Sequence, residues 1–182
     1  RSANNGDIIP VVSYSDTNYD DAQVNITLTG AMRKGVALDG SYADQHNGKV
    51  FTFKNFAKEK EVDDIYTLAA TLTDKAGNTT EKTILFSANR FGSTYALSAA
   101  TDQLNGSYVQ TPQDVVVTET NPDALQNIRI TLFKNNQTII LQEGTDYRIE
   151  VRGGNGQWYE YIYTVLAKNF ADDGVYRLTF YS

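Results

Sequence analysis

The chain has 182 residues, a formal net charge of −6 and no cysteine. The acidic excess is shared, with 10 basic and 12 acidic residues through Phe91 and 6 and 10 afterwards. No basic cluster is present, so we expect no nucleic-acid partner. No apolar stretch approaches the ~18 residues of a membrane-spanning helix, so we expect no membrane insertion.

Alternation of apolar and polar residues with a period of two dominates both halves of the chain. Successive side chains of a strand point to opposite faces, so each run has one core face and one solvated face, as in antiparallel sheets. The expected strands of the first half are 8–14, 22–29, 34–38, 48–54, 65–73 and 79–87. Those of the second half are 94–98, 114–119, 127–134, 137–141, 145–151, 157–166 and 174–182.

Turn-forming residues separate these runs. Asn-Gly pairs, which tolerate the positive φ of tight turns, begin at Asn5, Asn47, Asn105 and Asn155. The segment Asp-Lys-Ala-Gly-Asn at 74–78 separates two strand patterns and predicts a hairpin. Short strands joined by tight turns indicate an all-β chain.

One pattern occurs twice. Asn-Phe-Ala at 55–57, followed after a polar gap by Ile-Tyr-Thr-Leu at 65–68, returns as Asn-Phe-Ala at 169–171 and Val-Tyr-Arg-Leu at 175–178. Each copy lies late in its half, which predicts two modules of one architecture in tandem. We place them at 1–91 and 92–182, joined by a short linker at 88–93.

The tyrosine of each copy points to a particular fold. Tyr66 and Tyr176 each begin a strand just after acidic residues, the position of a tyrosine corner, in which the phenol bonds to upstream backbone. About seven short strands per module indicate a two-sheet sandwich of immunoglobulin type. The sequence therefore predicts an all-β chain of two tandem immunoglobulin-like antiparallel β-sandwiches.

The second module ends early relative to the first. Aligned on the two tyrosines, Ser182 corresponds to Leu72, and the hairpin that follows Leu72 has no counterpart. We expect the last strand of the second sandwich to be lacking, shortened or substituted, with 92–108 as one candidate substitute. An unfilled edge exposes unpaired N–H and C=O groups and invites strand addition.

Residues for catalysis are sparse. The only histidine, His46, lies in a turn, there is no cysteine nucleophile, and no serine lies in a G-x-S-x-G elbow. Two carboxylates at the spacing for glycoside hydrolysis are not excluded by sequence, but the acids cluster in turns. We expect no catalytic residue, no cofactor and no enzymatic activity.

A weak calcium candidate lies at Asp16, Asn18 and Asp20, which are spaced like the start of a calcium-binding loop. Asp21 replaces the glycine that such a loop requires, and Thr27 replaces its bidentate glutamate. An Asx-rich turn without metal is the favoured interpretation.

The best candidate for recognition is the aromatic run at 158–163. As a strand it places Tyr159, Tyr161 and Tyr163 on one face and Trp158 on the other. Both faces cannot be buried in a sandwich, so we predict one accessible aromatic row, with Arg152 in the preceding hairpin tip. Tyrosine, tryptophan and arginine are favoured at protein interfaces, although strand propensity and a wide core explain the aromatics equally well.

A family resemblance rests on Pro10, on Asp-Thr-Asn-Tyr-Asp at 16–20 and on the hairpin at 74–78. These features resemble the bacterial immunoglobulin-like (Big-type) repeats of Gram-positive cell-surface proteins over 7–90. Over 94–182 the resemblance is weaker and depends on Phe170 and the corner. It implies a bacterial protein that is secreted or anchored to the cell wall, and the lack of cysteine agrees with a bacterial exterior.

The resemblance also implies the class of function. Such repeats serve as adhesins, stalks or accessory modules of enzymes, and some bind host molecules. The leading hypothesis is a non-catalytic extracellular module pair for adhesion or host-protein binding, with immunoglobulin among the candidate partners and host glycan as another. The alternatives are a structural stalk or spacer and an accessory carbohydrate-binding module of a secreted enzyme.

Overall fold

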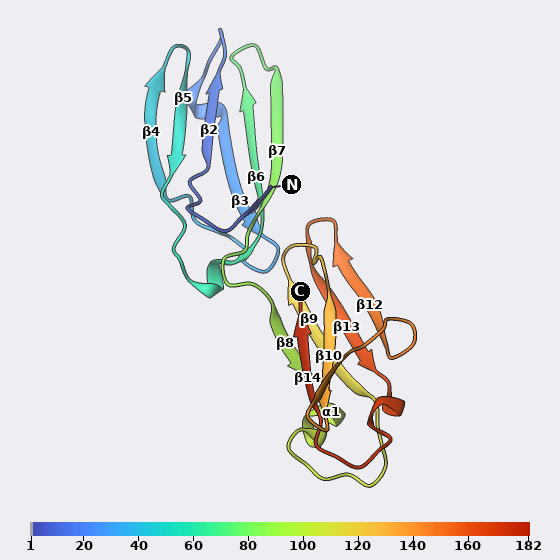
Figure 1. The fold of residues 1–182 in the computed structure, drawn as a ribbon. Coiled ribbons are helices and arrows are strands. Elements are labelled where there is room, and N and C mark those ends of the chain that lie inside the picture. The colour runs from blue at the N-terminus through green and yellow to red at the C-terminus, as the bar shows by residue number, and fades with distance from the viewer. Residues whose placement is uncertain (1) are drawn as a thin grey trace. The chain divides into compact units, whose positions relative to one another are not determined.

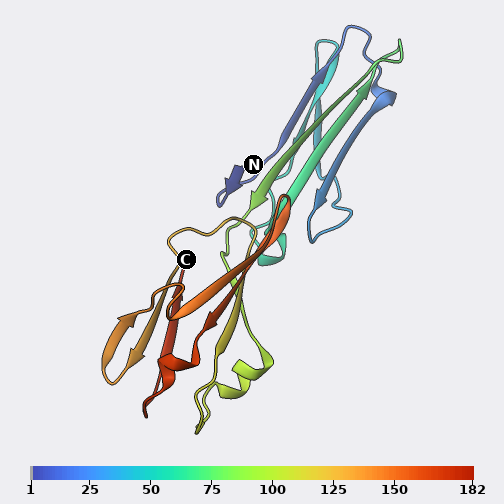
Figure 2. The ribbon, with the colours of Figure 1, turned by 90° about the vertical axis from the view of Figure 1, so that its right-hand side faces the viewer.

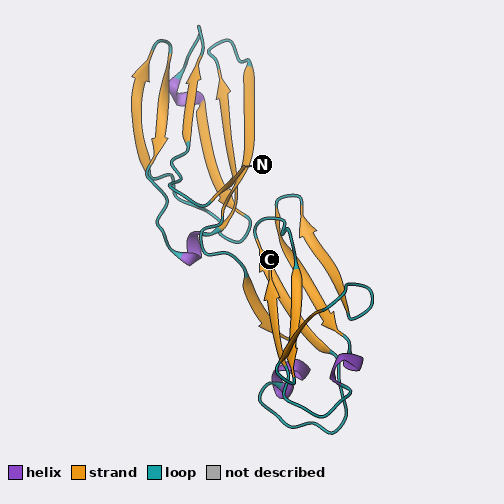
Figure 3. Cartoon of the chain, in the orientation of Figure 1, coloured by secondary structure: helices purple, strands orange, loops and turns teal. Residues whose placement is uncertain are grey.

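The computed structural model describes residues 2–182, which form two compact units built almost entirely from strands (Figures 1 and 3). The first unit ends at Phe91 and includes Asn155–Trp158; the second comprises Gly92–Gly154 and Tyr159–Ser182. Helical structure in the described part is limited to α1 (Ala99–Leu104) and to 3-10 turns at Asp21–Gln23, Lys60–Val62 and Ala167–Phe170. None of these helices is long and apolar enough to cross a membrane.

The first sandwich has a four-stranded and a three-stranded sheet, whose strands are seen from two sides in Figures 1 and 2. The larger sheet has the order β1 (Ser2–Asn4), β7 (Thr79–Ala88), β6 (Asp64–Thr73), β3 (Val24–Gly30). The smaller has the order β2 (Val11–Ser15), β5 (Gly48–Phe53), β4 (Gly40–Gln45). The pairs are antiparallel except that β1 runs parallel to β7.

The core of this sandwich follows the predicted alternation. Along β3, Ile26 and Leu28 are buried while the residues between them are exposed. The buried residues that pack together are Ile8, Ile26, Leu28, Phe51, Phe53, Tyr66, Leu68, Phe86 and Ala88. The strand expected at 34–38 is wrong: that segment has no regular structure, and the strand that precedes β5 and pairs with it is β4. Its sequence Gly-Ser-Tyr-Ala-Asp-Gln has no apolar alternation because it is almost wholly exposed.

The β4–β5 hairpin shows why one Asn-Gly pair is required. Asn47 has φ 55° in the turn, a conformation that asparagine tolerates. Gly48 passes so close to β2 that a Cβ atom there would lie 1.9 Å from the carbonyl oxygen of Tyr14. Only glycine fits this close backbone approach.

The second sandwich also has a four-stranded and a three-stranded sheet. The larger has the order β12 (Tyr147–Gly154), β13 (Gln157–Val165), β9 (Val115–Asn121), β8 (Thr94–Leu97). The smaller has the order β11 (Gln137–Ile140), β10 (Arg129–Lys134), β14 (Arg177–Tyr181). The buried core consists of Ile130, Leu132, Leu141, Tyr147, Tyr161, Tyr163 and Val165.

Both strand orders are those of immunoglobulin-like sandwiches, in which the sheets are ABED and CFG. In the first sandwich β2, β5 and β4 correspond to B, E and D, and β3, β6 and β7 to C, F and G. In the second, β8, β9, β13 and β12 correspond to A, B, E and D, and β10 and β14 to C and F. The fold prediction is confirmed: the chain is two tandem immunoglobulin-like β-sandwiches.

The edge of the second sandwich differs from that of the first. Within residues 2–182, β14 pairs with β10 and with no strand on its other side. The suggestion that 92–108 substitutes for the last strand is wrong, because β8 pairs with β9 and the chain then enters α1. In Figure 1 the red β14 runs beside β10.

Candidate functional site

The tyrosine row of β13 faces the core of the second sandwich. Tyr163 is 0% exposed and Tyr161 is 6% exposed, and half-buried Tyr159 packs against the same cluster. The Tyr161 hydroxyl accepts a hydrogen bond from the backbone N–H of Leu125 at 2.9 Å, and its ring stacks on Tyr159. The prediction that Tyr161 and Tyr163 belong to an accessible binding row is therefore wrong, because they fill the space between the two sheets.

A buried carboxylate holds the end of this tyrosine row. Glu119, on β9, is 0% exposed and accepts hydrogen bonds from the hydroxyls of Tyr163 at 2.6 Å, Tyr95 at 2.8 Å and Ser182 at 2.7 Å. Because these donors come from β13, β8 and the residue after β14, the carboxylate connects both sheets. Sequence reasoning missed it, although Glu119 shares the core face of β9 with buried Val117.

Burial and hydrogen bonding shift the pKa of this carboxylate in opposite directions. Burial alone raises the pKa of Glu119, but hydrogen bonds from Ser93, Tyr163, Ser182 and Tyr95 outweigh it and hold the pKa below its ordinary value. Burial, together with the bond to the carboxylate, raises the pKa of the Tyr163 phenol. The site therefore holds an ionised glutamate stabilised by neutral hydroxyls, an arrangement suited to joining strands.

The outer face of the same sheet carries the other predicted residues. Alternation along β13 places Trp158, Glu160 and Ile162 opposite the tyrosine row. On β12, Arg152 is exposed, and its Nε donates to Glu150 at 2.8 Å. The face continues over β9, where Thr118 pairs with Ile162 and Thr120 with Glu160. On this face Trp158 and Ile162 are half-buried, and the fully exposed side chains are the charged ones, Arg148, Glu150, Arg152 and Glu160.

The calcium candidate forms a turn held by its own side chains. The Asp16 carboxylate accepts the backbone N–H of Asn18 at 2.7 Å, and the Asp20 carboxylate accepts the N–H of Ala22 at 3.0 Å. These are the bonds of Asx turns. In the part of the chain that is described, no three His, Cys, Asp or Glu side chains come together as a metal site.

Both predicted corner tyrosines bond to the backbone four residues upstream. The Tyr66 hydroxyl donates to the carbonyl of Val62 at 2.7 Å, and the Tyr176 hydroxyl donates to the carbonyl of Asp172. Burial raises the pKa of Tyr66, although Arg33 donates to the same hydroxyl at 3.0 Å. These hydrogen bonds hold the start of each F strand in place, so the role of the two tyrosines is structural.

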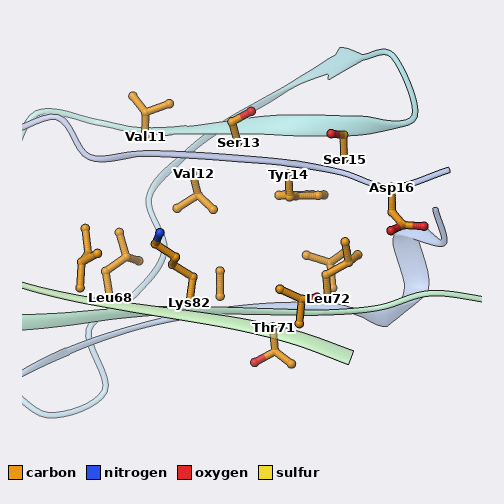
Figure 4. A pocket seen from close by; sticks show the side chains of 14 residues that line it. Val11, Val12, Ser13, Tyr14, Ser15, Asp16, Leu68, Thr71, Leu72 and Lys82 are labelled. Carbon is orange, nitrogen blue, oxygen red and sulfur yellow. The ribbon is translucent and has the colours of Figure 1, made fainter. Parts of the chain in front are cut away.

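A groove of about 560 Å³ opens along one side of the first sandwich, between β2 and β7. Figure 4 shows Val12 and Tyr14 pointing from β2 into the groove, while Val11, Ser13 and Ser15 point away. Leu68, Leu72 and Lys82 line the opposite side. The side chains that enter the groove from core-facing positions, among them Val12, Tyr14 and Leu68, belong to the core of the sandwich, so the groove is an open side of the sandwich and lacks the convergent polar groups of a ligand pocket.

No protein-family model and no curated protein matches the sequence. Among solved structures, the chain is similar to tandem immunoglobulin domains of titin, at 10% identity and a TM-score of 0.42 over 100% of this chain and 84% of that one. A second titin fragment matches at 11% identity and a TM-score of 0.40 over 100% and 86%. Tandem immunoglobulin repeats of Dlar match at 12% identity and a TM-score of 0.27 over 100% and 84%. The fold assignment itself rests on the strand orders described above.

Proposed function

We propose that the chain is a non-catalytic, extracellular module pair of a bacterial surface protein that acts in adhesion or host-protein binding. The observation that supports this most is the outer face of the β12–β13 sheet, where Trp158 and Arg152 lie on a face that does not contribute to the core. The first sandwich, whose exposed strand positions are mostly small or polar and include five threonines, Thr27, Thr29, Thr79, Thr80 and Thr83, serves as a spacer. The placement at the cell wall or in secretion rests on the resemblance to Big-type repeats and on the lack of cysteine.

The chemistry of this face suits a protein partner. Tryptophan supplies a large rigid contact area, and arginine binds carboxylates through its planar fork. Arg148, Glu150, Arg152 and Glu160 alternate in sign, which favours a partner surface of mixed charge over a polyanion. A host extracellular protein fits this pattern, with immunoglobulin among the candidates.

A screen of the whole chain against immunoglobulins, matrix proteins and a glycan array tests the proposal. We expect a protein hit whose affinity falls by on the order of tenfold or more in the double variant Trp158→Ala, Arg152→Ala, because hot-spot truncation costs about 1.4 kcal/mol or more. The matched control is Tyr108→Ala, which removes a fully exposed aromatic from a loop and leaves binding unchanged.

The outcomes separate the candidate functions. A hit that keeps its affinity in the double variant contradicts the proposed surface while retaining the function. Retention of glycans alone, lost in Trp158→Ala, supports an accessory carbohydrate-binding module, because a tryptophan on a sheet face can stack on sugar rings. Failure of every protein and glycan to bind favours a structural spacer.

A further inference from the structure

The strands β10 and β14 turn alternate side chains away from the core of the second sandwich. On this outer face the register places Arg129 opposite Tyr181, and the Arg129 guanidinium lies 4.3 Å from the centre of the Tyr181 ring. It also places Phe133 opposite Arg177, whose guanidinium lies 5.0 Å from the centre of the Phe133 ring. Both distances are within the range of cation–π attraction. These four residues form the arginine–aromatic face, which a further strand beside β14 would leave open, because neighbouring strands lie in the plane of the sheet.

The two guanidiniums of this face have no anionic partner. Within residues 2–182, no carboxylate forms an ion pair with Arg129 or Arg177, and neither side chain donates a hydrogen bond to another described residue. On the other sheet, by contrast, Arg152 is paired with Glu150. The strands β10, β11 and β14 contain no Asp or Glu. The arginine–aromatic face is therefore a positively charged surface on a chain whose net charge is −6.

The equivalent face of the first sandwich has different chemistry. The corner residues Tyr66 and Tyr176 align β6 with β14, and the registers of these two strands then align β3 with β10. The four positions of the arginine–aromatic face are occupied in the first sandwich by uncharged polar residues, namely Asn25, Thr29, Thr67 and Thr71. A sandwich of this architecture therefore forms without arginines or rings on this face, so a contact outside the sandwich is the better reason for them.

The aromatic rings hold the guanidiniums in a state that suits carboxylate binding. A side chain that already lies against a ring loses less conformational freedom when a partner binds. The guanidinium N–H donors lie in the guanidinium plane and can bind both oxygens of a carboxylate. Thr131 lies between Arg129 and Phe133 on this face and is only 7% exposed, which means that neighbouring side chains lie across it. The face is thus preorganised for carboxylates.

We propose that the arginine–aromatic face binds an extended acidic segment of a partner polypeptide. Arg129 lies opposite Tyr181, four residues along β14 from Arg177, so the two arginines are about 13 Å apart along the strands. In an extended segment, residues i and i+4 point to the same side and are separated by the same distance of about 13 Å. The segment therefore places one carboxylate at i and a second at i+4, each against one arginine.

The surface between the two arginines selects the residue at i+2. The midpoint of the face is level with Thr131, which pairs with Ile140 on β11, and Ile140 is 54% exposed. An apolar side chain at i+2 points to the same side as the two carboxylates and covers Ile140. Nucleic acid and polymers of carboxylates offer charge without such a side chain. The preferred pattern is therefore acidic, any residue, apolar, any residue, acidic.

A synthetic peptide in which Glu-Thr-Val-Thr occurs three times and is followed by Glu is the direct probe. Its control carries Gln in place of every Glu, which removes the charge and keeps the shape. With the full chain, the NMR signals of the amides at 129–133 and 177–181 should shift with a dissociation constant of about 1 mM or tighter. They should not shift with the control. The amides of Thr27 and Thr29, on the equivalent face of the first sandwich, should respond to neither peptide.

Matched variants locate the binding surface without changing the core. Arg129→Ala, Arg177→Ala replaces two exposed side chains and should weaken the probe by on the order of tenfold, because two charge-assisted contacts are lost. The control Arg148→Ala, Arg152→Ala removes two positive charges from β12, on the other sheet, and should leave the affinity unchanged. Because this control alters the β12–β13 face, failure here and failure of the function proposed for that face are distinguishable.

Four results would overturn the proposal. The first is an absence of shifts at 129–133 and 177–181 at millimolar probe. The second is an unchanged affinity in Arg129→Ala, Arg177→Ala, which would place the binding elsewhere. The third is equally tight binding of a polyglutamate peptide of the same length, which would mean that the face attracts negative charge without selecting the pattern. The fourth is a sialylated oligosaccharide that binds more tightly than the probe and is lost in the same double variant, because the occupant would then be a glycan.

Discussion

The strands β6 and β14 occupy the same position in two related sandwiches, and they differ in their neighbours. β6 pairs with β3 and β7, whereas within residues 2–182 β14 pairs with β10 alone. Tyr66 lies near the start of β6 and Tyr176 directly precedes β14, and the hydroxyl of each bonds to the carbonyl four residues upstream. Tyr66 is nevertheless 0% exposed and Tyr176 is half-buried. The corner motif sets the start of the strand, and the flanking strands determine how much of it is buried.

The basic side chains beside Tyr66 and Tyr176 also contact these tyrosines in different ways. The Arg33 guanidinium donates a hydrogen bond to the buried hydroxyl oxygen of Tyr66. Lys134 instead lies 5.6 Å from the face of the more open Tyr176 ring. The comparison teaches that the same corner bond forms around a buried tyrosine in the first sandwich and a half-buried tyrosine in the second.

The largest expected effect tests burial of the F strand directly. Leu68→Ala should destabilise the first sandwich by about 3 kcal/mol, because it opens a cavity at a 3% exposed position. Leu178→Ala at the equivalent position should cost about half as much, because part of that side chain already contacts water. Denaturant unfolding followed by residue-resolved exchange measures the two sandwiches separately, and equal losses would contradict the comparison.

The next largest effect concerns the buried carboxylate of Glu119, which has no counterpart in the first sandwich. Glu119→Gln should destabilise the second sandwich by about 2 kcal/mol, because hydrogen bonds to a charged group are replaced by weaker ones to an amide. The exposed Glu143→Gln is the matched control and should change stability by less than about 0.5 kcal/mol. Unfolding curves of the full chain provide the measurement, and a neutral Glu119→Gln would show that the hydroxyl cage contributes little.

The corner bonds should have smaller effects. Tyr66→Phe should cost about 1 kcal/mol, since it leaves the Val62 carbonyl and the Arg33 guanidinium without their partner. Tyr176→Phe should cost about 0.5 kcal/mol, because water can replace the lost hydroxyl at a half-exposed site. Thermal melts of both variants decide this, and a larger loss in Tyr176→Phe would reverse the ranking of the two corners.

The smallest expected effect is a pH dependence confined to the second sandwich. The pKa of Glu119 is lower in the folded chain than its ordinary value, so its stabilising contribution is present above the unfolded pKa of about 4.3 and is lost as pH falls through the folded pKa. The unfolding free energy of the second sandwich should therefore fall below about pH 5 less steeply in Glu119→Gln than in the unchanged chain. Identical slopes in the two chains would assign the acid sensitivity to other carboxylates.

Much of the fold could be predicted because strand alternation and the corner motif depend on residues that are close together in the sequence. The alternation along β3 and the repeated corner tyrosines are properties of neighbouring residues, and they predicted strands and sandwiches correctly. β4 escaped prediction because it is held by pairing with β5 and not by an apolar face of its own. The face of β13 that would be buried was equally undetermined, since both of its faces carry aromatics.

By itself, the sequence determined the class of structure: strands from alternation, turns from Asn-Gly, and two related sandwiches from the repeated Tyr66 and Tyr176 patterns. Only the tertiary structure decided that Tyr161 and Tyr163 are interior, that Glu119 joins the two sheets, and that β14 pairs with β10. The physical reason is the sequence separation of the residues that determine each property. A side chain's alternation depends on its own strand, but its burial and hydrogen-bond partners depend on strands far away in the chain.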